Sequence, residues 1–277
     1  MYDFYFGSKE QIKKREDKFL LSIKRMMPRW VNSLPDSEFL ALADIVDKQG
    51  KSIGKKKLIT VETGAGASTL VFAFYAMKYN GMAFSWDYNS KKGSLIRTIC
   101  NETMCNYFNK HIDDYWKLIG HDSLSPYLGM PILNEMVDHV DVFFHDSEHT
   151  WNTVKSEIDI IDPLLIDGSV VALDDANQDF LHTNMAYINT FRKKIGLGSV
   201  ESLKDNNSGP FYINTEKLLK SKWKNVEHID DLYKKSYMND PYFNYYDSEF
   251  EIKSSLGTER LSSLEHRFDS WKVSNRI

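Results

Sequence analysis

The chain has 277 residues, of which 42% are hydrophobic and 13% aromatic, and its formal net charge is −4. This length and composition suit one large domain with a substantial core, and they argue against a largely disordered chain. The slightly acidic balance argues against a general nucleic-acid-binding protein, which needs a basic surface to neutralise phosphates. We interpret the basic clusters at 13–15 and 55–57 as solvated faces, because acidic residues elsewhere offset them.

The cysteines and the first residues indicate the compartment. The chain has two cysteines, Cys100 and Cys105, too few for the disulfide framework of a secreted protein. The first residues lack the apolar core of a signal peptide, and no apolar run approaches the length of a membrane span. These features predict a soluble, cytoplasmic protein.

Residues 1–57 have a polar, helical pattern. The clearest helix covers 33–51, where Asp36 or Ser37 is a suitable N-cap and Gly50 is suited to end the helix. We expect this helical N-terminal segment to pack beside the main domain or to act as a lid.

From residue 58 onward, apolar runs of strand type alternate with helical runs. Strands are predicted over 57–63, 81–89, 115–123, 139–149 and 169–177, and Gly168 is expected to turn the chain into the last of them. The intervening helices are predicted over 68–79, 94–110 and 150–165. The alternation predicts an α/β fold, a Rossmann-like doubly wound and mostly parallel sheet with helices on both faces. Such sheets bind ligands at the carboxyl ends of their strands.

The remaining sequence predicts a helix near 183–194 and an antiparallel edge hairpin over 198–215. We therefore divide the chain into a helical cap or lid (1–57), a ligand-binding domain (58–215) and a C-terminal extension (216–277). Aromatic side chains in the extension are candidates for a stacking wall against an acceptor, or for core or dimer contacts. They are Tyr237, Tyr242, Phe243, Tyr245 and Tyr246.

The stretch VETGAGAST, residues 61–69, joins the first predicted strand to a helix. Gly64 and Gly66 would let a ligand approach the backbone and the helix N-terminus. A dinucleotide motif needs a third glycine where this chain has Thr69. Glu62 would repel a pyrophosphate but attract an ammonium group, which favours a nucleotide that carries an amino acid. Glycines needed only for the geometry of the turn remain an alternative.

The run E-T-G-A-G-A-S resembles the first motif of class I S-adenosylmethionine-dependent methyltransferases, and the resemblance extends over roughly residues 55–215. It implies that the glycine loop binds the methionine part of the cofactor, through Glu62, Thr63, Gly64, Ala65, Gly66 and Ser68.

The same resemblance assigns roles to the next strand ends. It implies that Asp87, closing the second strand, accepts the ribose hydroxyls, as the paired oxygens of a carboxylate can. Asp122 and Ser123, closing the third strand, would read the adenine, and His145 would lie over the cofactor. Ordinary turn or helix-cap positions are the alternative for Asp87, Asp122 and Ser123.

Three aspartates, Asp146, Asp174 and Asp175, follow the fourth and fifth predicted strands, which this fold makes neighbours. Carboxylates so close repel and raise one another's pKa unless a cation lies among them, and Mg²⁺ prefers such oxygen ligands. The arrangement resembles metal-dependent O-methyltransferases of the catechol and macrolide-sugar types. That resemblance implies Mg²⁺ held by Asp146, Asp174 and Asp175. Solvent-exposed turn aspartates are the alternative.

A general base is expected close to Asp146. Catechol enzymes have a Lys three residues after the first Asp, where this chain has His149; an imidazole can take a proton near neutral pH. His149 is thus a candidate catalytic base beside Asp146, with a metal ligand or an orienting residue as alternatives. HDSEHTW also resembles the D-G-x-H-x-Y signature of a bacterial methyltransferase family linked to sugar or secondary-metabolite modification.

The sequence therefore predicts an S-adenosylmethionine-dependent, Mg²⁺-assisted O-methyltransferase acting on a hydroxyl of a saccharide or other small molecule. The alternatives are a metal-independent methyltransferase in which His149 works alone, and a non-catalytic nucleotide-binding module. A nicotinamide-linked reductase would leave Glu62 and Thr69 unexplained. NDPYF at 239–243 resembles the motif of amino-methylating nucleic-acid enzymes, but it does not follow the fourth strand. We expect no nucleic-acid or membrane partner, and a homodimer is the default assembly.

Overall fold

The computed structural model describes residues 6–32, 34, 36–54, 56–148, 151–174, 222–223, 227–228 and 269–273. Its strands are β1 (Ile59–Thr63), β2 (Met82–Asp87), β3 (Trp116–Gly120), β4 (Val140–His145), β5 (Leu165–Leu173), β6 (Glu227–His228) and β7 (Asp269–Lys272). Its α-helices are α2 (Lys9–Lys14), α3 (Glu16–Met26), α4 (Asp36–Ser52), α5 (Ala67–Lys78), α6 (Ser90–Glu102), α7 (Met104–Phe108), α8 (Leu133–Met136) and α9 (Trp151–Ile161). Short 3-10 turns are η1 (Arg29–Val31), η2 (Ile112–Asp114), η3 (Pro126–Leu128), η4 (Met130–Ile132) and η5 (Asp162–Leu164).

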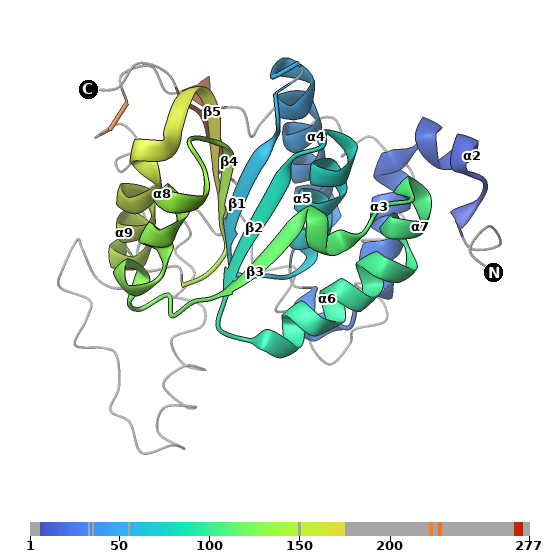
Figure 1. Cartoon of the computed structure of the whole chain (residues 1–277), viewed down its shortest axis with the longest axis horizontal. Coiled ribbons are helices and arrows are strands. Elements are labelled where there is room, and N and C mark those ends of the chain that lie inside the picture. The colour runs from blue at the N-terminus through green and yellow to red at the C-terminus, as the bar shows by residue number, and fades with distance from the viewer. Residues whose placement is uncertain are drawn as a thin grey trace.

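These strands form one sheet in the order β3-β2-β1-β4-β5-β7-β6. The five strands from β3 to β5 are parallel, whereas β7 runs antiparallel to β5 and to β6. Helices α4, α5 and α6 lie on one side of the sheet, and α8 and α9 lie on the other (Figure 1). The predicted Rossmann-like, doubly wound α/β fold is therefore confirmed.

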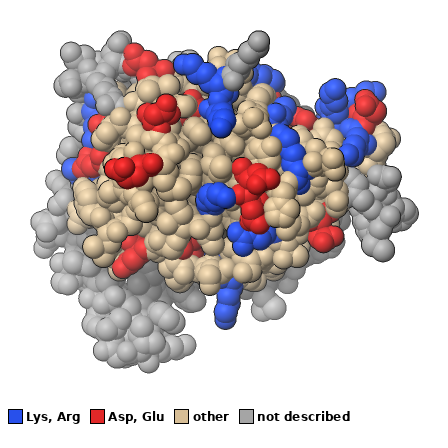
Figure 2. Space-filling view, in the orientation of Figure 1, with Lys and Arg blue, Asp and Glu red and all other residues tan. Residues whose placement is uncertain are grey.

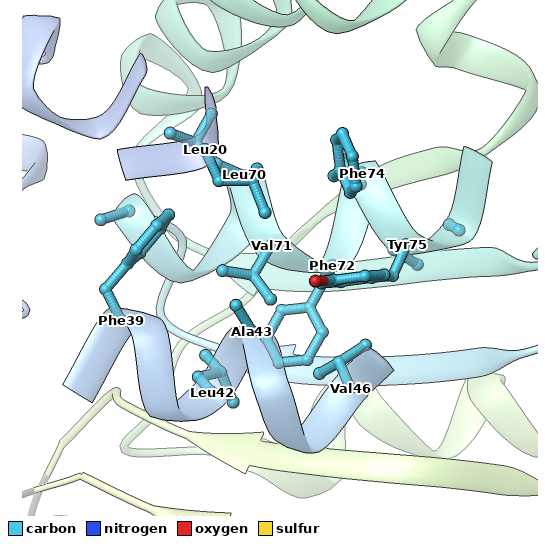
Figure 3. Packing of buried hydrophobic residues seen from close by; sticks show 14 of the residues in the cluster. Leu20, Phe39, Leu42, Ala43, Val46, Leu70, Val71, Phe72, Phe74 and Tyr75 are labelled. Atoms are coloured by element: carbon cyan, nitrogen blue, oxygen red, sulfur yellow. The ribbon is translucent and has the colours of Figure 1, made fainter. Parts of the chain in front are cut away.

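The first face of the sheet is covered by α5, which in turn is covered by the N-terminal segment. Every residue of α5 from Ala67 to Met77 is buried, because the helix lies between the sheet and α4 and has no polar face. Figure 3 shows Phe39, Leu42 and Val46 of α4 directed toward α5. The N-terminal helices and the sheet thus share one hydrophobic core.

The second face is covered by α9, whose apolar residues recur at helical spacing. Val154, Ile158 and Ile161 are buried against inward-facing residues of the sheet such as Val61 and Phe143. All five residues of β1 and all six of β4 are buried, as expected for parallel strands covered on both faces.

Gly50 does not end α4, contrary to the prediction, because the helix continues to Ser52. A Cβ at Gly50 would lie 2.2 Å from a ring atom of Tyr79, so the glycine makes room for this ring. Gly54, with φ +67°, follows the end of the helix instead. Asp36 begins α4, and its carboxylate pairs with Lys24 at 2.7 Å and Arg25 at 2.8 Å.

Two strand boundaries also differ from the prediction. β3 ends at Gly120, so Asp122 and Ser123 lie in the following loop. β5 begins at Leu165 and includes Gly168, which has φ +94° and lies where the register between β4 and β5 shifts. Gly168 is therefore an irregularity inside the strand rather than a turn before it.

The predicted helix at 183–194 and the hairpin at 198–215 lie outside the described residues, as do the aromatic residues from 237 to 246. The antiparallel strand beside β5 comes from 269–272, within the segment assigned to the C-terminal extension. The three-part division of the chain stays a prediction.

Basic and acidic side chains are interspersed on the face shown in Figure 2. Within the described part of the chain, no helix has the length and apolar character needed to cross a membrane.

Candidate functional site

The carboxyl ends of the central strands are joined by main-chain hydrogen bonds just beyond the sheet. The amides that follow β1, β4 and β5 each donate to a neighbouring strand end: Gly64 N to Trp86 O at 2.8 Å, Asp146 N to Thr63 O at 2.8 Å and Asp174 N to His145 O at 2.9 Å. The structure therefore brings the glycine loop and the loops after β4 and β5 to one edge of the sheet, which we call the rim. This is the edge where parallel sheets bind ligands.

Position 64 must be a glycine because the main chain of Asp146 occupies the space that a Cβ would need. It has φ +89°, and a Cβ there would lie 1.8 Å from the carbonyl oxygen of Asp146. A Cβ at Gly66 would lie 3.2 Å from the carbonyl oxygen of Val31 in η1. The first glycine thus permits contact between two loops of the rim, and the second lies against the N-terminal segment.

Glu62 supports the glycine loop from below. Its carboxyl group has no exposed surface and accepts hydrogen bonds from the hydroxyls of Ser68, Thr69 and Ser85. Burial raises the pKa of Glu62 to about 7, against the lowering effect of these hydroxyl donors. The predicted direct contact between Glu62 and an ammonium group does not fit this position, because both oxygens bind buried hydroxyls.

Thr69 occupies the position where a dinucleotide motif has its third glycine. Its hydroxyl donates to Glu62 and accepts from the amide of Gly66 at 3.0 Å. Thr69 therefore connects the glycine loop to the buried carboxyl group, a role that the sequence did not reveal.

Asp87 ends β2 as predicted and is 5% exposed. Its carboxylate accepts from the amides of Ala65 at 2.9 Å and Asn89 at 2.7 Å, and from the ammonium of Lys92 at 3.0 Å. Asp87 thus fixes the glycine loop to the end of β2, with Lys92 as an additional partner that sequence reasoning missed.

The loop after β3 places the predicted adenine-reading pair at its surface. Asp122 is exposed and its Oδ1 accepts from the amide of Leu124 at 3.0 Å, while Ser123 is half-buried. His121, in contrast, is 7% exposed, and its amide donates to the carbonyl of Asp87 at 3.3 Å. The adenine-reading role of Asp122 and Ser123 stays a prediction.

A buried carboxylate, Glu157 of α9, lies under the rim on the second face of the sheet. Its Oε2 accepts from Thr63 Oγ1 at 2.6 Å and pairs with His145 Nδ1 at 2.7 Å. Its Oε1 accepts from Ser147 Oγ at 2.9 Å and pairs with His121 Nε2 at 3.3 Å. Burial acts to raise the pKa of Glu157, but the two imidazoles and the hydroxyl of Thr63 outweigh it and lower the pKa to about 2. The group is therefore ionised.

Sequence reasoning missed Glu157, although one signal was present. Glu157 lies three residues after Val154 and four before Ile161, on the face of the helix that the apolar spacing predicted to be buried. A charged residue on a buried face needs partners, and here one of them is His145. The His145 side chain is fully buried against Glu157, beneath the rim, rather than in the predicted position over a cofactor.

Two of the three predicted metal ligands lie at neighbouring strand ends. Asp146 follows β4 and is half-buried, and Asp174 follows β5 and is 7% exposed. Asp175 and the predicted base His149 lie outside the described residues. Carboxylate oxygens from adjacent strand ends suit a hard cation. In the described ranges, however, no three His, Cys, Asp or Glu side chains are grouped so that they could hold a metal ion.

The parallel sheet, the glycine loop after β1 and the acidic end of β2 define a ligand-binding domain of the Rossmann-like class. Residues 61–176 match the family model described as a methyltransferase domain. The match covers every strand end of the rim from β1 to β5. Over these residues the chain is similar to methyltransferase domains, which agrees with the resemblance of its glycine motif.

A comparison with curated proteins gives no match. Among solved structures, the chain is similar to an O-methyltransferase from Bacillus cereus in complex with SAH, with 13% identity, a TM-score of 0.44, and coverage of 83% of this chain and 92% of that one. It is similar to CalS11, a TDP-rhamnose 3'-O-methyltransferase of calicheamicin biosynthesis, with 17% identity, a TM-score of 0.43, and coverage of 68% and 86%. It is also similar to the SAH-bound methyltransferase PaMTH1 of Podospora anserina, with 11% identity, a TM-score of 0.46, and coverage of 93% and 87%.

The contact between Gly64 and Asp146 predicts a severe effect of one methyl group. Gly64→Ala adds a backbone clash to a left-handed φ and should destabilise the fold by about 3 kcal/mol or more. Gly168→Ala is the matched control, since Gly168 has φ +94° but open space around its Cβ position, and it should cost about 1 kcal/mol. Urea denaturation measures both values. Equal losses of unfolding free energy in the two variants would show that the contact between Gly64 and Asp146 does not limit the residue at position 64.

The raised pKa of Glu62 predicts a stability that depends on pH. Because the folded pKa of about 7 lies above the ordinary value of 4.5, Glu62 stabilises the fold below about pH 4.5 and loses this contribution as the pH rises to about 7. Glu62→Gln, which stays neutral, should therefore gain several degrees in Tm relative to the wild type between pH 5 and pH 8. Thermal denaturation at several pH values measures this. Glu102→Gln is the control, because Glu102 is exposed. A difference in Tm between Glu62→Gln and the wild type that does not change with pH would refute the prediction.

Proposed function

We propose that this protein is an S-adenosylmethionine-dependent O-methyltransferase that uses a divalent cation, such as Mg²⁺, to methylate a hydroxyl of a saccharide or another small molecule. The observation that carries the proposal is the methyltransferase-domain match over 61–176, which coincides with a glycine loop and an acidic strand end held together at one rim. S-adenosylmethionine, when bound, supplies a methyl group that is already activated on a sulfonium.

In this proposal the chain's own residues bind and align the cofactor. The main chain from Gly64 to Gly66 would lie beneath the methionine part, held in place by the close contact between Gly64 and Asp146 and by the hydrogen bond from the amide of Ala65 to Asp87. Asp87 is the acceptor for the two ribose hydroxyls. Lys92 contacts Oδ2 of Asp87 at 3.0 Å and is partly exposed, so ribose would share this carboxylate with Lys92 or displace it.

The acceptor would bind beside the loops after β4 and β5. Asp146, Asp174 and Asp175 would hold the cation, which when bound lowers the pKa of a coordinated hydroxyl and orients it. His149 would accept the hydroxyl proton, and Asp146 would lie next to it. The neighbouring positions of Asp146 and Asp174 support this part of the proposal.

A metal-independent methyltransferase of the same fold is the second candidate. His149 would then act as base without a cation.

The remaining parts of the proposal concern partners and location. The net charge of −4 supports a small acceptor rather than a nucleic acid. Cys100 and Cys105 are both free thiols, which supports a reducing, cytoplasmic compartment. In the same proposal the protein forms a homodimer and has no membrane partner.

Cofactor binding is the first test. Isothermal titration with S-adenosylhomocysteine should give a saturable heat, and Asp87→Asn should weaken binding about tenfold or more because a buried charged acceptor is lost. Asp113→Asn is the control, since Asp113 is a half-buried acidic residue paired with Arg97 away from the rim. Circular dichroism checks that each variant is folded. No binding by the wild type, with binding of a nicotinamide dinucleotide instead, would refute the proposal.

The cation is tested separately. Titration with Mg²⁺ should give a heat that EDTA abolishes and that Asp174→Asn removes. Asp167→Asn is the control, because Asp167 is exposed near the opposite end of the same strand β5. An identical Mg²⁺ heat in wild type and Asp174→Asn would favour the metal-independent candidate.

A further inference from the structure

We propose that Glu157 is a positioning residue that holds the glycine loop after β1 and the loop after β4 in a fixed relation to each other. The consequence for methyl transfer rests on the proposed function, because these two loops are the ones assigned to cofactor and acceptor. The relation itself is a property of the fold that is measurable without a ligand.

The inference starts from the positions of the four donors around Glu157. Thr63 directly precedes Gly64, and His145 and Ser147 flank Asp146. The fourth donor comes from the end of β3, where His121 also binds the main chain of Asp87. One carboxylate on α9 therefore contacts the carboxyl ends of β1, β3 and β4.

The residues that Glu157 contacts lie on both sides of the close contact between Gly64 and Asp146 at the rim. The carbonyl of Asp146 leaves no room for a Cβ at Gly64, and the amide of Asp146 donates to the carbonyl of Thr63. A shift of either loop must therefore move the other. Because Glu157 binds the side chains of Thr63 and Ser147, it determines where the pair of loops lies above α9.

The choice of a carboxylate at this position needs a reason beyond stability. A buried charge is costly to remove from water, and apolar residues of similar volume often stabilise a core as well or better. Val154, Ile158 and Ile161 show that the surrounding face of α9 is apolar. An ionised carboxylate offers acceptors for four donors at once, whereas a glutamine amide would direct N–H groups at some of those donors. The carboxylate thus selects one arrangement of the strand ends.

The hydrogen bonds to Glu157 also determine which ring nitrogen of each imidazole carries a proton. His145 faces Oε2 with Nδ1, and His121 faces Oε1 with Nε2, so each ring donates through the nitrogen that faces Glu157. The orientation of both rings is thereby fixed beneath the rim. Side chains held in this way keep the main chain that carries Asp146 from rotating.

The experiment compares Glu157→Gln with Asp159→Asn. Asp159 lies two residues further along α9 and pairs with Lys155 and Lys222, so its variant changes charge on the same helix without contacting the rim. Native-state hydrogen exchange of the free protein is measured at the amides of Gly64 and Asp146, with Val61 in the middle of β1 as the internal reference. Glu157→Gln should accelerate exchange at Gly64 and Asp146 about tenfold, with Val61 unchanged. Asp159→Asn should change none of the three.

The second readout is the affinity for S-adenosylhomocysteine. Glu157→Gln should weaken binding about tenfold at a temperature where circular dichroism shows a folded protein, whereas Asp159→Asn should bind as the wild type does. A residue that acts only on global stability would accelerate exchange at Val61 as well and would leave the affinity of the folded protein unchanged; that result overturns the inference. Unchanged exchange at Gly64 and Asp146 overturns it too.

Two further measurements cover the cases in which Glu157→Gln does not fold or the wild type binds no ligand. If Glu157→Gln does not fold, Thr63→Val and Ser147→Ala each remove one donor and keep the carboxylate, and each should accelerate exchange locally at Gly64 or Asp146. If the wild type binds no S-adenosylhomocysteine, the proposed function fails while the exchange data still decide the role of Glu157.

Discussion

The rim depends on the contact between Gly64 and the main chain of Asp146. A left-handed residue without a Cβ lets two adjacent strand ends approach until their main chains touch. The approach brings the loop after β1 and the loop after β4 to one place, and the hydrogen bond from Asp174 to His145 extends the arrangement to β5. Residues from three separate parts of the sequence therefore form one surface, which is the condition for aligning a cofactor with an acceptor.

Two buried carboxyl groups hold this contact from opposite faces of the sheet. Glu62 binds only hydroxyl groups, so burial dominates and its pKa rises to about 7. Glu157 meets two imidazoles as well as hydroxyls, and the opposing contributions leave its pKa at about 2. The same side chain type thus provides a partly ionised acceptor beneath α5 and a fully ionised one above α9 near pH 7. The difference comes from the partners, because both groups are fully buried.

The sequence was sufficient to predict the order of β1 to β5 and of α5, α6 and α9, because hydrophobic periodicity reports burial directly, but it did not predict β6 and β7. It also located Asp87, since a carboxylate after an apolar run ends a strand. It did not reveal why Gly50 is a glycine, because the ring of Tyr79 that requires it is 29 positions away and meets it only in the folded chain. Glu157 was missed for a similar reason: its four partners come from three strand ends. Glu62 was located correctly, but its charge was assumed to face a ligand, whereas three hydroxyls surround it.

The position of Glu62 also bears on which ligand the glycine loop can accept. A helix N-terminus binds a pyrophosphate through free amides and the positive end of the helix dipole. In this chain the amide of Gly66 donates to Thr69, and Thr69 and Ser68 of the first turn of α5 both donate to Glu62. A carboxyl group that is partly ionised near pH 7 thus lies beneath the helix end and offsets its positive potential. Such a site disfavours an anion and tolerates a cation, which suits a sulfonium cofactor better than a dinucleotide.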